Sequence, residues 1–266
     1  MSRHLGYGIT ATVDPQLVRE LAPAVERAGL RTLWVNQPGR DGDALAALAA
    51  AAEVTSTLRL ATGVLPVDLY PADDVAARVA DLALPTDRLV LGIGASRRPH
   101  PLGTARDAVR TLRDELGVPV LVGALGPRMR RLAVTEADGV LLNWLTPGVA
   151  REALGDRDRD VREAGGPGGA VALYVRCALG PAAREVAHRE AEKYAAIPTY
   201  AANFARHGYQ PIESAVLADD AAGIRTGLEP FPDEVDELVA RAVTASDGLE
   251  EHLALVDAIA DRRADA

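Results

Sequence analysis

One short segment rich in small residues, Gly123-Ala124-Leu125-Gly126-Pro127, is the most informative candidate for chemistry in this chain. It joins an apolar run to a predicted helix that begins near Arg128. Small residues leave backbone N–H groups accessible at a helix N-terminus, where the helix dipole is positive, and this arrangement binds phosphate without lysine. Arg128 or Arg130 can add positive charge. A tight strand-to-helix turn is the alternative interpretation.

Asn143 and Thr146 follow the next apolar run and can complete such a phosphate site. Their amide and hydroxyl groups both donate hydrogen bonds to anionic oxygens. The alternative is helix capping, because Thr146 precedes Pro147 as an N-cap residue precedes proline at the first helical position.

The other segments that follow apolar runs are mostly neutral and contain much glycine, at 36–39, 63–66 and 92–97. They hold no pair of carboxylates and no histidine, so they suit a flat, weakly charged ligand better than hydrolytic acid–base chemistry. Gly92 and Gly94 also fit part of a dinucleotide-binding loop, but Arg97 occupies the place of its third glycine. A tight exit from a strand is the alternative.

The composition excludes several classes of function. The chain has 266 residues with 29 Lys plus Arg against 38 Asp plus Glu, a net charge of −9 that argues against nucleic acid as a partner. Its longest uncharged stretches, roughly a dozen residues, fall short of a membrane span, and the N-terminus lacks the apolar core of a signal peptide. Cys177 is the single cysteine, and the five histidines lack metal-ligand spacing. We therefore expect a cytoplasmic protein without a metal site.

Short apolar runs alternate with amphipathic runs, and this alternation predicts strands and helices in turn. The predicted strands are 5–10, 32–35, 58–64, 89–93, 118–122, 139–142, 170–178 and 237–243. The predicted helices are 15–28, 44–54, 71–83, 104–116, 128–136, 149–164 and 249–260, with Asp14, Asp43 and Thr104 as N-caps.

Strands that are apolar on both faces and separated by helices indicate a parallel sheet covered by helices. Their number and period favour a closed (β/α)8 TIM barrel, an α/β fold, over an open sheet. We expect one domain over 1–266, with a helical insertion at 181–236 between the seventh and eighth strands. In such a barrel, the segments at the carboxyl ends of the strands form the active site.

Several stretches resemble the bacterial luciferase-like family, and within it the coenzyme F420-dependent oxidoreductases. They are residues 33–35, 55–64, 88–95, 120–127 and 137–147, and residues 241–247 fit the last strand of that family. The resemblance runs in order over roughly residues 5–180, and 123–127 together with 143–147 are its most specific part.

This resemblance implies a TIM barrel that binds a flavin or deazaflavin at the carboxyl end of its strands. It implies a non-proline cis peptide bond at Gly63–Val64 that braces the ring, and a cofactor tail and phosphate held by 123–126. The residues that we assign to the cofactor on this basis are Asn36, Gly63, Val64, Gly94, Ala95, Gly123, Ala124, Leu125, Gly126, Asn143 and Thr146.

The sequence also departs from the family pattern. Relatives that oxidise sugar phosphates carry an Asp-His pair and a glutamate where this chain has Asn36, Gln37 and Arg97. The segment 95–104 is short, so the pocket is either more open or covered by residues 195–210. Apart from Arg97 and Arg98, no charged cluster is evident near the predicted mouth.

The leading hypothesis is an F420-dependent oxidoreductase that transfers a hydride between the deazaflavin C5 and a small enone, imine or carbonyl. The alternatives are an FMN-dependent monooxygenase and a non-catalytic barrel that binds a flavin or deazaflavin. Candidate proton donors are His207, Tyr200 and Tyr7. Trp34 and Trp144 either stack on the ring or belong to the core. A homodimer is expected from the resemblance, with the alanine-rich helix as a possible contact face.

Overall fold

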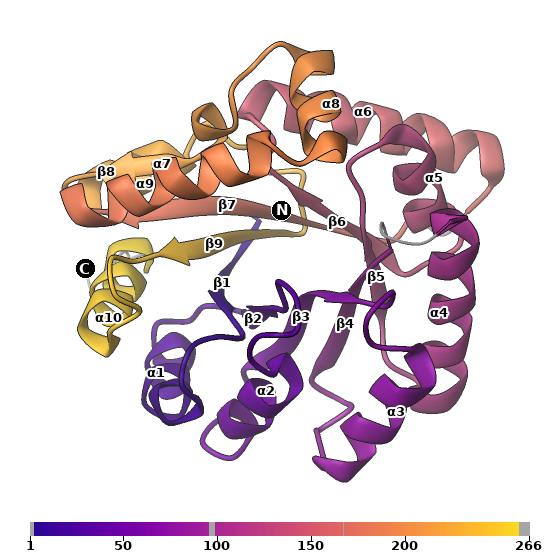
Figure 1. Cartoon of the computed structure of the whole chain (residues 1–266), viewed down its shortest axis with the longest axis horizontal. Helices are drawn as coiled ribbons and strands as arrows, with labels where there is room; N and C mark the ends of the chain where they lie inside the picture. Colours follow the sequence, from indigo (N-terminus) through magenta and orange to yellow (C-terminus); the bar gives the residue numbers. More distant parts are fainter. Residues whose placement is uncertain (1–2, 96–98, 167, 261–266) are drawn as a thin grey trace.

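The computed structural model describes residues 3–95, 99–166 and 168–260, which form a closed barrel of parallel strands surrounded by helices (Figure 1). The strands pair in chain order from β1 to β7, and β9 closes the barrel between β7 and β1. The barrel strands are β1 His4–Thr10, β2 Thr32–Asn36, β3 Arg59–Pro66, β4 Leu89–Gly94, β5 Val120–Gly123, β6 Gly139–Asn143, β7 Ala170–Leu179 and β9 Glu237–Val243. The predicted TIM barrel is confirmed, and β9 has the bounds predicted for the eighth strand.

The helices begin and end close to the predicted positions, with one correction. They are α1 Pro15–Arg27, α2 Ala44–Ala52, α3 Ala72–Asp81, α4 Pro101–Leu116, α5 Pro127–Thr135, α6 Pro147–Ala164, α7 Pro181–Ala195, α8 Pro198–His207, α9 Ala221–Leu228 and α10 Leu249–Ile259. Thr104 is not the N-cap of α4, because the helix already begins at Pro101 and His100 takes the N-cap position. Proline is favoured at the first helical position, and this preference set the start of the helix.

The insertion between β7 and β9 is helical, as predicted, and carries one element that the sequence did not reveal. It holds α7, α8, a 3-10 helix at Pro211–Ser214, the short strand β8 at Val216–Ala218, and α9. β8 lies outside the barrel and pairs with the end of β7. In Figure 1, α7 and α8 run along the side of the barrel where β7 and β6 lie.

The alanine-rich helix α2 packs within the chain itself. Its small side chains are largely buried against the neighbouring elements, among them Ala44, Leu45, Ala47, Leu48, Ala50 and Ala51. The buried face of α2 is therefore used within the chain, and the homodimer stays a prediction. Within the described part of the chain, no helix is long and apolar enough to span a membrane.

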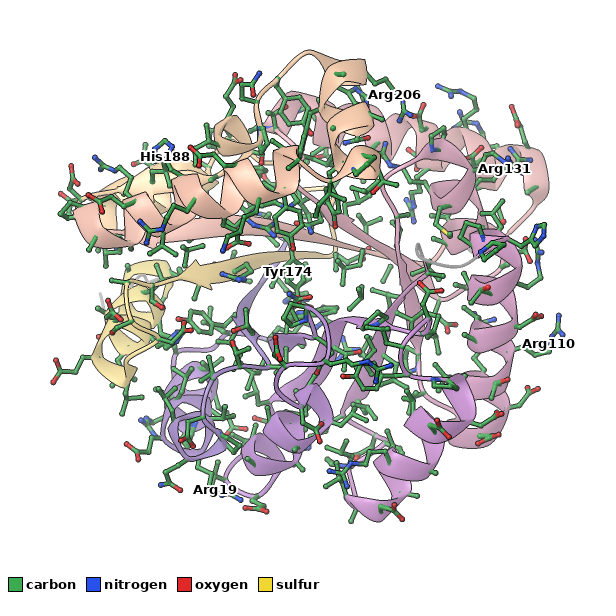
Figure 2. All side chains as sticks on the ribbon, in the orientation of Figure 1. Arg19, Arg110, Arg131, Tyr174, His188 and Arg206 are labelled. Carbon is green, nitrogen blue, oxygen red and sulfur yellow. The ribbon has the colours of Figure 1, made fainter. Side chains whose placement is uncertain are left out.

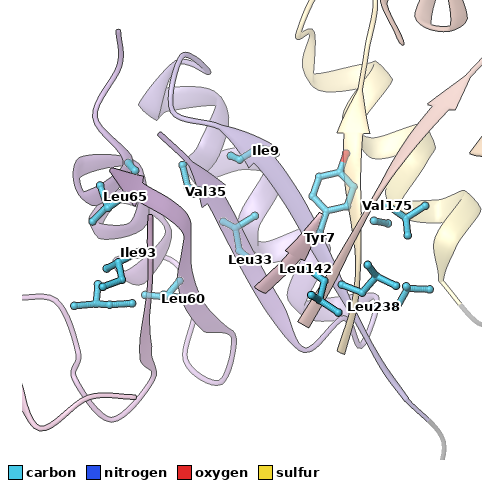
Figure 3. Packing of buried hydrophobic residues seen from close by; sticks show 14 of the residues in the cluster. Tyr7, Ile9, Leu33, Val35, Leu60, Leu65, Ile93, Leu142, Val175 and Leu238 are labelled. Carbon is cyan, nitrogen blue, oxygen red and sulfur yellow. The ribbon is translucent and has the colours of Figure 1, made fainter. Parts of the chain in front are cut away.

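Side chains of the barrel strands alternate between two hydrophobic clusters, because successive residues of a strand face opposite sides. One set packs under the surrounding helices and includes Leu33, Val35, Leu142 and Val175 (Figure 3). The other set points into the barrel and consists of Trp34, Ala61, Val90, Leu121, Leu141, Ala172, Tyr174 and Val239. The interior therefore holds a packed core rather than a channel.

A buried carboxyl group lies in this interior at the amino-terminal end of β9. Glu237 accepts hydrogen bonds from Trp34 Nε1 at 2.9 Å and from Thr32 Oγ1 at 3.0 Å. Burial raises the pKa of Glu237 above its usual value, although both hydrogen bonds act in the opposite direction. Trp34 is thus a core residue, which was one of its two predicted roles.

A buried tyrosine–histidine pair ties β1 to α10. The Tyr7 hydroxyl lies 2.9 Å from His252 Nδ1 and donates to the backbone oxygen of His252 at 3.2 Å. Both side chains are buried, and burial lowers the pKa of His252 although Asp247 and Glu251 raise it. His252 therefore stays neutral in the folded state more readily than in the unfolded chain.

This pair predicts a pH-dependent loss of stability. Because the folded-state pKa of His252 lies below the unfolded value of 6.5, its contribution is fully present above pH 6.5 and is lost as the pH falls. We expect the difference in unfolding free energy between the native chain and His252→Gln to shrink on acidification below pH 6.5, as measured by urea unfolding. A difference that stays constant down to pH 5 contradicts this assignment.

Candidate functional site

A cavity of about 460 Å3 opens at the carboxyl end of the barrel strands. Its volume lies within the range typical of small-molecule sites. All residues that the sequence analysis assigned to a cofactor line it except Thr146, namely Asn36, Gly63, Val64, Gly94, Ala95, Gly123, Ala124, Leu125, Gly126 and Asn143. The barrel therefore brings segments that are far apart in the chain to one site.

Thr146 is not among the residues that line this cavity, and it caps a helix instead. Its hydroxyl accepts a hydrogen bond from the Val149 N–H at 3.4 Å and caps α6. The capping alternative for Thr146 and Pro147 is what the structure shows, and a contact between Thr146 and a cofactor stays a prediction.

The wall on the side of β3, β4 and β5 is shaped around Val64. A cis peptide bond joins Gly63 to Val64, as the family resemblance implied, and the pairing of β3 with β4 shifts register at this point. A Cβ atom at Gly94 would lie 2.8 Å from Val64 Cγ2, and one at Gly123 would lie 2.9 Å from Val64 Cγ1. Both glycines are required by this close approach, since larger residues would displace Val64. We call this wall, formed by Gly63, Val64, Gly94 and Gly123, the glycine wall.

The segment 123–126 leads directly into the N-terminus of α5. Gly126 is the N-cap residue and makes no side-chain capping bond, so it leaves the first N–H groups of the helix without that partner. Gly126 and Met129 line the cavity and also an adjoining groove, to which Arg128 and Arg206 contribute. An anion at this helix end would meet a positive dipole and two arginines.

The side of the cavity formed by β7 and β9 carries positive charge, which corrects the expectation that no charged cluster other than Arg97 and Arg98 lies near the mouth. Arg176, Arg206 and Arg241 line the cavity. Arg97 and Arg98, the charged residues noted in the sequence, lie outside the described residues.

The two strand arginines are held by one glutamate of α7. Arg176 Nε donates to Glu190 Oε1 at 3.1 Å, and Arg241 Nη2 lies 3.5 Å from Glu190 Oε2. Arg176 also donates to Asn143 Oδ1, and its guanidinium lies 3.5 Å from the centre of the Trp144 ring. Burial alone would raise the pKa of Glu190, but Arg241 and Arg176 hold it below the usual value. Glu190 is therefore ionised and fixes both guanidinium groups.

Tyr174 lines the cavity and belongs to the interior cluster of the barrel, and Figure 2 shows it near the centre of the molecule. It is 3% exposed, and its hydroxyl has no hydrogen-bond partner among the described residues. A Cβ atom at Gly63 would overlap this hydroxyl, so Tyr174 reaches across the barrel from β7 to β3. Burial raises the pKa of Tyr174 well above 10, which keeps the hydroxyl protonated and makes it a hydrogen-bond donor.

The insertion covers the cavity, as one of the two sequence interpretations proposed. Tyr194, Thr199, Tyr200, Ala202 and Arg206 of α7 and α8 line it. Figure 2 shows Arg206 on α8 at the upper edge of the molecule, away from Tyr174 at the centre. The rings of Tyr194 and Tyr200 meet edge to face with centres 4.7 Å apart.

Of the three candidate proton donors, the structure brings only Tyr200 to the cavity. Burial raises the pKa of Tyr200, so its hydroxyl remains protonated at neutral pH. Tyr7 is buried against His252, and His207 Nδ1 lies 3.3 Å from Glu152 Oε2, and neither lines the cavity. Trp144 is likewise a buried residue beneath Arg176 and not part of the lining.

Comparison with known sequences identifies relatives. The sequence profile of the luciferase-like monooxygenases matches residues 1–114 and 101–265 of the chain. The 5,10-methylenetetrahydromethanopterin reductase of Methanolobus tindarius is 25% identical in an alignment of 170 positions that covers 50% of this chain and 52% of that protein. The chain spans about half the length of the curated relatives it matches.

Comparison with solved structures shows the shared fold. An F420-dependent secondary alcohol dehydrogenase in complex with an F420–acetone adduct has a TM-score of 0.77 at 17% identity, covering 98% of this chain and 100% of that chain. The monooxygenase RslO1 from Streptomyces bottropensis has a TM-score of 0.70 at 17% identity, covering 98% of this chain and 99% of that chain.

Proposed function

We propose that this chain, which belongs to the luciferase-like monooxygenase family, is an oxidoreductase that binds coenzyme F420 in the cavity at the end of its barrel. The F420-dependent dehydrogenase that shares its fold supports this choice of cofactor. The observation that carries the proposal is the glycine wall, together with the uncapped N-terminus of α5 beside it.

The residues present fit such a cofactor. Because Gly94 and Gly123 have no side chains, Val64 fits between them, and its side chain gives the cavity an apolar surface against which a flat ring can lie. Residues 123–126 and the first N–H groups of α5 suit the phosphate of the tail. Asn36 and Asn143 place amide groups in the same lining. When bound, a reduced deazaflavin supplies a hydride to an enone, imine or carbonyl, and the oxidised form accepts one.

The chain itself contributes position and protons rather than a nucleophile. Among the described residues that line the cavity there is no carboxylate and no histidine. Tyr174 and Tyr200 hold their protons at neutral pH, since burial raises both pKa values, and so each is a donor to a substrate oxygen or nitrogen. Tyr194 and Tyr200 of the insertion cover the cavity and limit access of water.

Titration of the purified protein with F420 and with FMN, followed by fluorescence quenching, tests the choice of cofactor. We expect saturable binding of F420 with an affinity about ten-fold or more above that for FMN. A protein that binds neither cofactor contradicts the proposal.

FMN-dependent monooxygenation is the second candidate function, favoured by the family as a whole and by a monooxygenase with the same fold. Preferential binding of FMN in the same titration would support it. Tight binding of F420 without turnover of any member of a panel of enones, imines and carbonyls would instead indicate a non-catalytic binding protein.

A further inference from the structure

The cavity has two chemically different sides. The glycine wall and residues 123–126 present apolar side chains and backbone, whereas β7 and β9 present Arg176 and Arg241. Every charged residue in the described lining is an arginine. Glu190, the carboxylate that both strand arginines share, is not part of the lining, and one negative charge against two positive charges leaves an excess of one positive charge.

On the side formed by β7 and β9, hydrogen-bond donors outnumber acceptors. A guanidinium has five N–H groups, and the hydrogen bonds of Arg241 and Arg176 to Ala242, Asn143 and Glu190 use part of them. The Asn143 side chain is already engaged, since Oδ1 accepts from Arg176 and the amide also interacts with the Tyr200 hydroxyl. The Tyr174 hydroxyl is a buried donor with no partner among the described residues. Buried donors without acceptors are costly, so this arrangement favours a ligand rich in acceptor oxygens.

We propose that the substrate of this site is a small organic carboxylate, anchored by Arg176 and Arg241 with the Tyr174 hydroxyl as a further donor. A carboxylate is planar and matches the donor geometry of a guanidinium. The inference rests on the proposed function, which assigns the glycine wall to the cofactor and so leaves the arginine side to the substrate. Arg206 is not part of the proposed carboxylate site, because it also lines the outer groove at the N-terminus of α5.

The test compares carboxylates with their uncharged amides on the protein saturated with F420. Acetate, 2-oxobutanoate and benzoate are titrated by calorimetry beside acetamide, 2-oxobutanamide and benzamide. We expect at least one carboxylate to bind about ten-fold or more tightly than its amide, and this preference to weaken at high salt. Equal binding within all three pairs, or binding of none, overturns the proposal.

Substitution of Arg241 tests whether the carboxylate binds at this arginine. Arg241→Gln should remove most of the preference for the carboxylate and change F420 affinity little, whereas Arg151→Gln, an exposed arginine that bonds to Pro147 and Pro230, should change neither. Loss of F420 affinity with an unchanged carboxylate preference would assign the arginine to the cofactor and overturn the inference. If Arg241→Gln fails to fold by circular dichroism, Arg241→Lys and the comparison on the native chain still decide.

Failure of the proposed function gives a different result. A native chain that binds neither F420 nor FMN contradicts the cofactor assignment, independently of how the arginine variants bind carboxylates. The same paired titrations on the cofactor-free protein then decide the anion site separately, since a retained preference for carboxylates supports it and its absence overturns it.

Discussion

Replacing Gly126 by aspartate should lower the affinity for F420 by about 2 kcal/mol, roughly 30-fold, whereas asparagine at the same position should cost much less. Gly126 is the N-cap of α5 and lines the cavity. An aspartate there would occupy the first N–H groups of the helix and place a negative charge where the phosphate of the cofactor is proposed to bind. Fluorescence titration with F420 measures the effect.

Asparagine is the matched control because it has nearly the same shape without the charge. A Cβ atom at Gly126 would meet no atom within 4 Å, and both substituents are favoured N-cap residues, so neither variant should unfold the protein. Equal F420 affinities for Gly126→Asp and the native chain would show that the anionic tail binds elsewhere.

Removing the hydroxyl of Tyr174 should weaken ligand binding while leaving the protein as stable or more stable. This hydroxyl is buried without a partner among the described residues, so Tyr174→Phe removes an unsatisfied donor and can stabilise by about 1 kcal/mol. A hydrogen bond to a carboxylate would be lost at the same time, at a cost of roughly ten-fold in affinity. Thermal unfolding and calorimetry with the carboxylate panel measure the two effects.

Tyr7→Phe is the control, and we expect it to change the free energy of unfolding in the opposite direction. It removes the same atom from an equally buried tyrosine, but here the hydroxyl bonds to His252 and does not line the cavity. We expect a loss of about 1 kcal/mol or more in the free energy of unfolding and no change in ligand affinity. If Tyr174→Phe destabilises as Tyr7→Phe does and leaves carboxylate affinity unchanged, the hydroxyl has only a structural role.

Local rules of sequence were sufficient for the elements and for one side of the site. Apolar periodicity and helix caps such as Asp14 and Asp43 predicted strands and helices because these signals act within a few residues. Thr104 shows the limit of such rules, since a proline at position 101 begins the helix earlier. The segments at the strand ends contained Gly94, Gly123 and Asn143, and a parallel barrel necessarily collects such ends at one face.

The same rules did not predict that Arg176 and Arg241 line the cavity, because both residues lie inside strands and not in the segments after them. The signal was present as a charged residue within each of two apolar strands, at positions paired in the register of β7 with β9. Each stands two residues beyond an interior core residue, Tyr174 or Val239, and so faces the same way. Alternation alone does not say which of the two faces is the interior.

What the sequence determined by itself was therefore the order of the barrel strands and of the helices between them, the family, and the neutral, glycine-rich segments at the strand ends, each encoded by residues close together in the chain. What only the tertiary structure decided was which face of each strand points into the barrel once β9 has closed it. That closure brings Tyr174 against Gly63, and the packing of α7 brings Glu190 between two arginines. These contacts depend on distances in space between residues far apart in the chain, which no local pattern records.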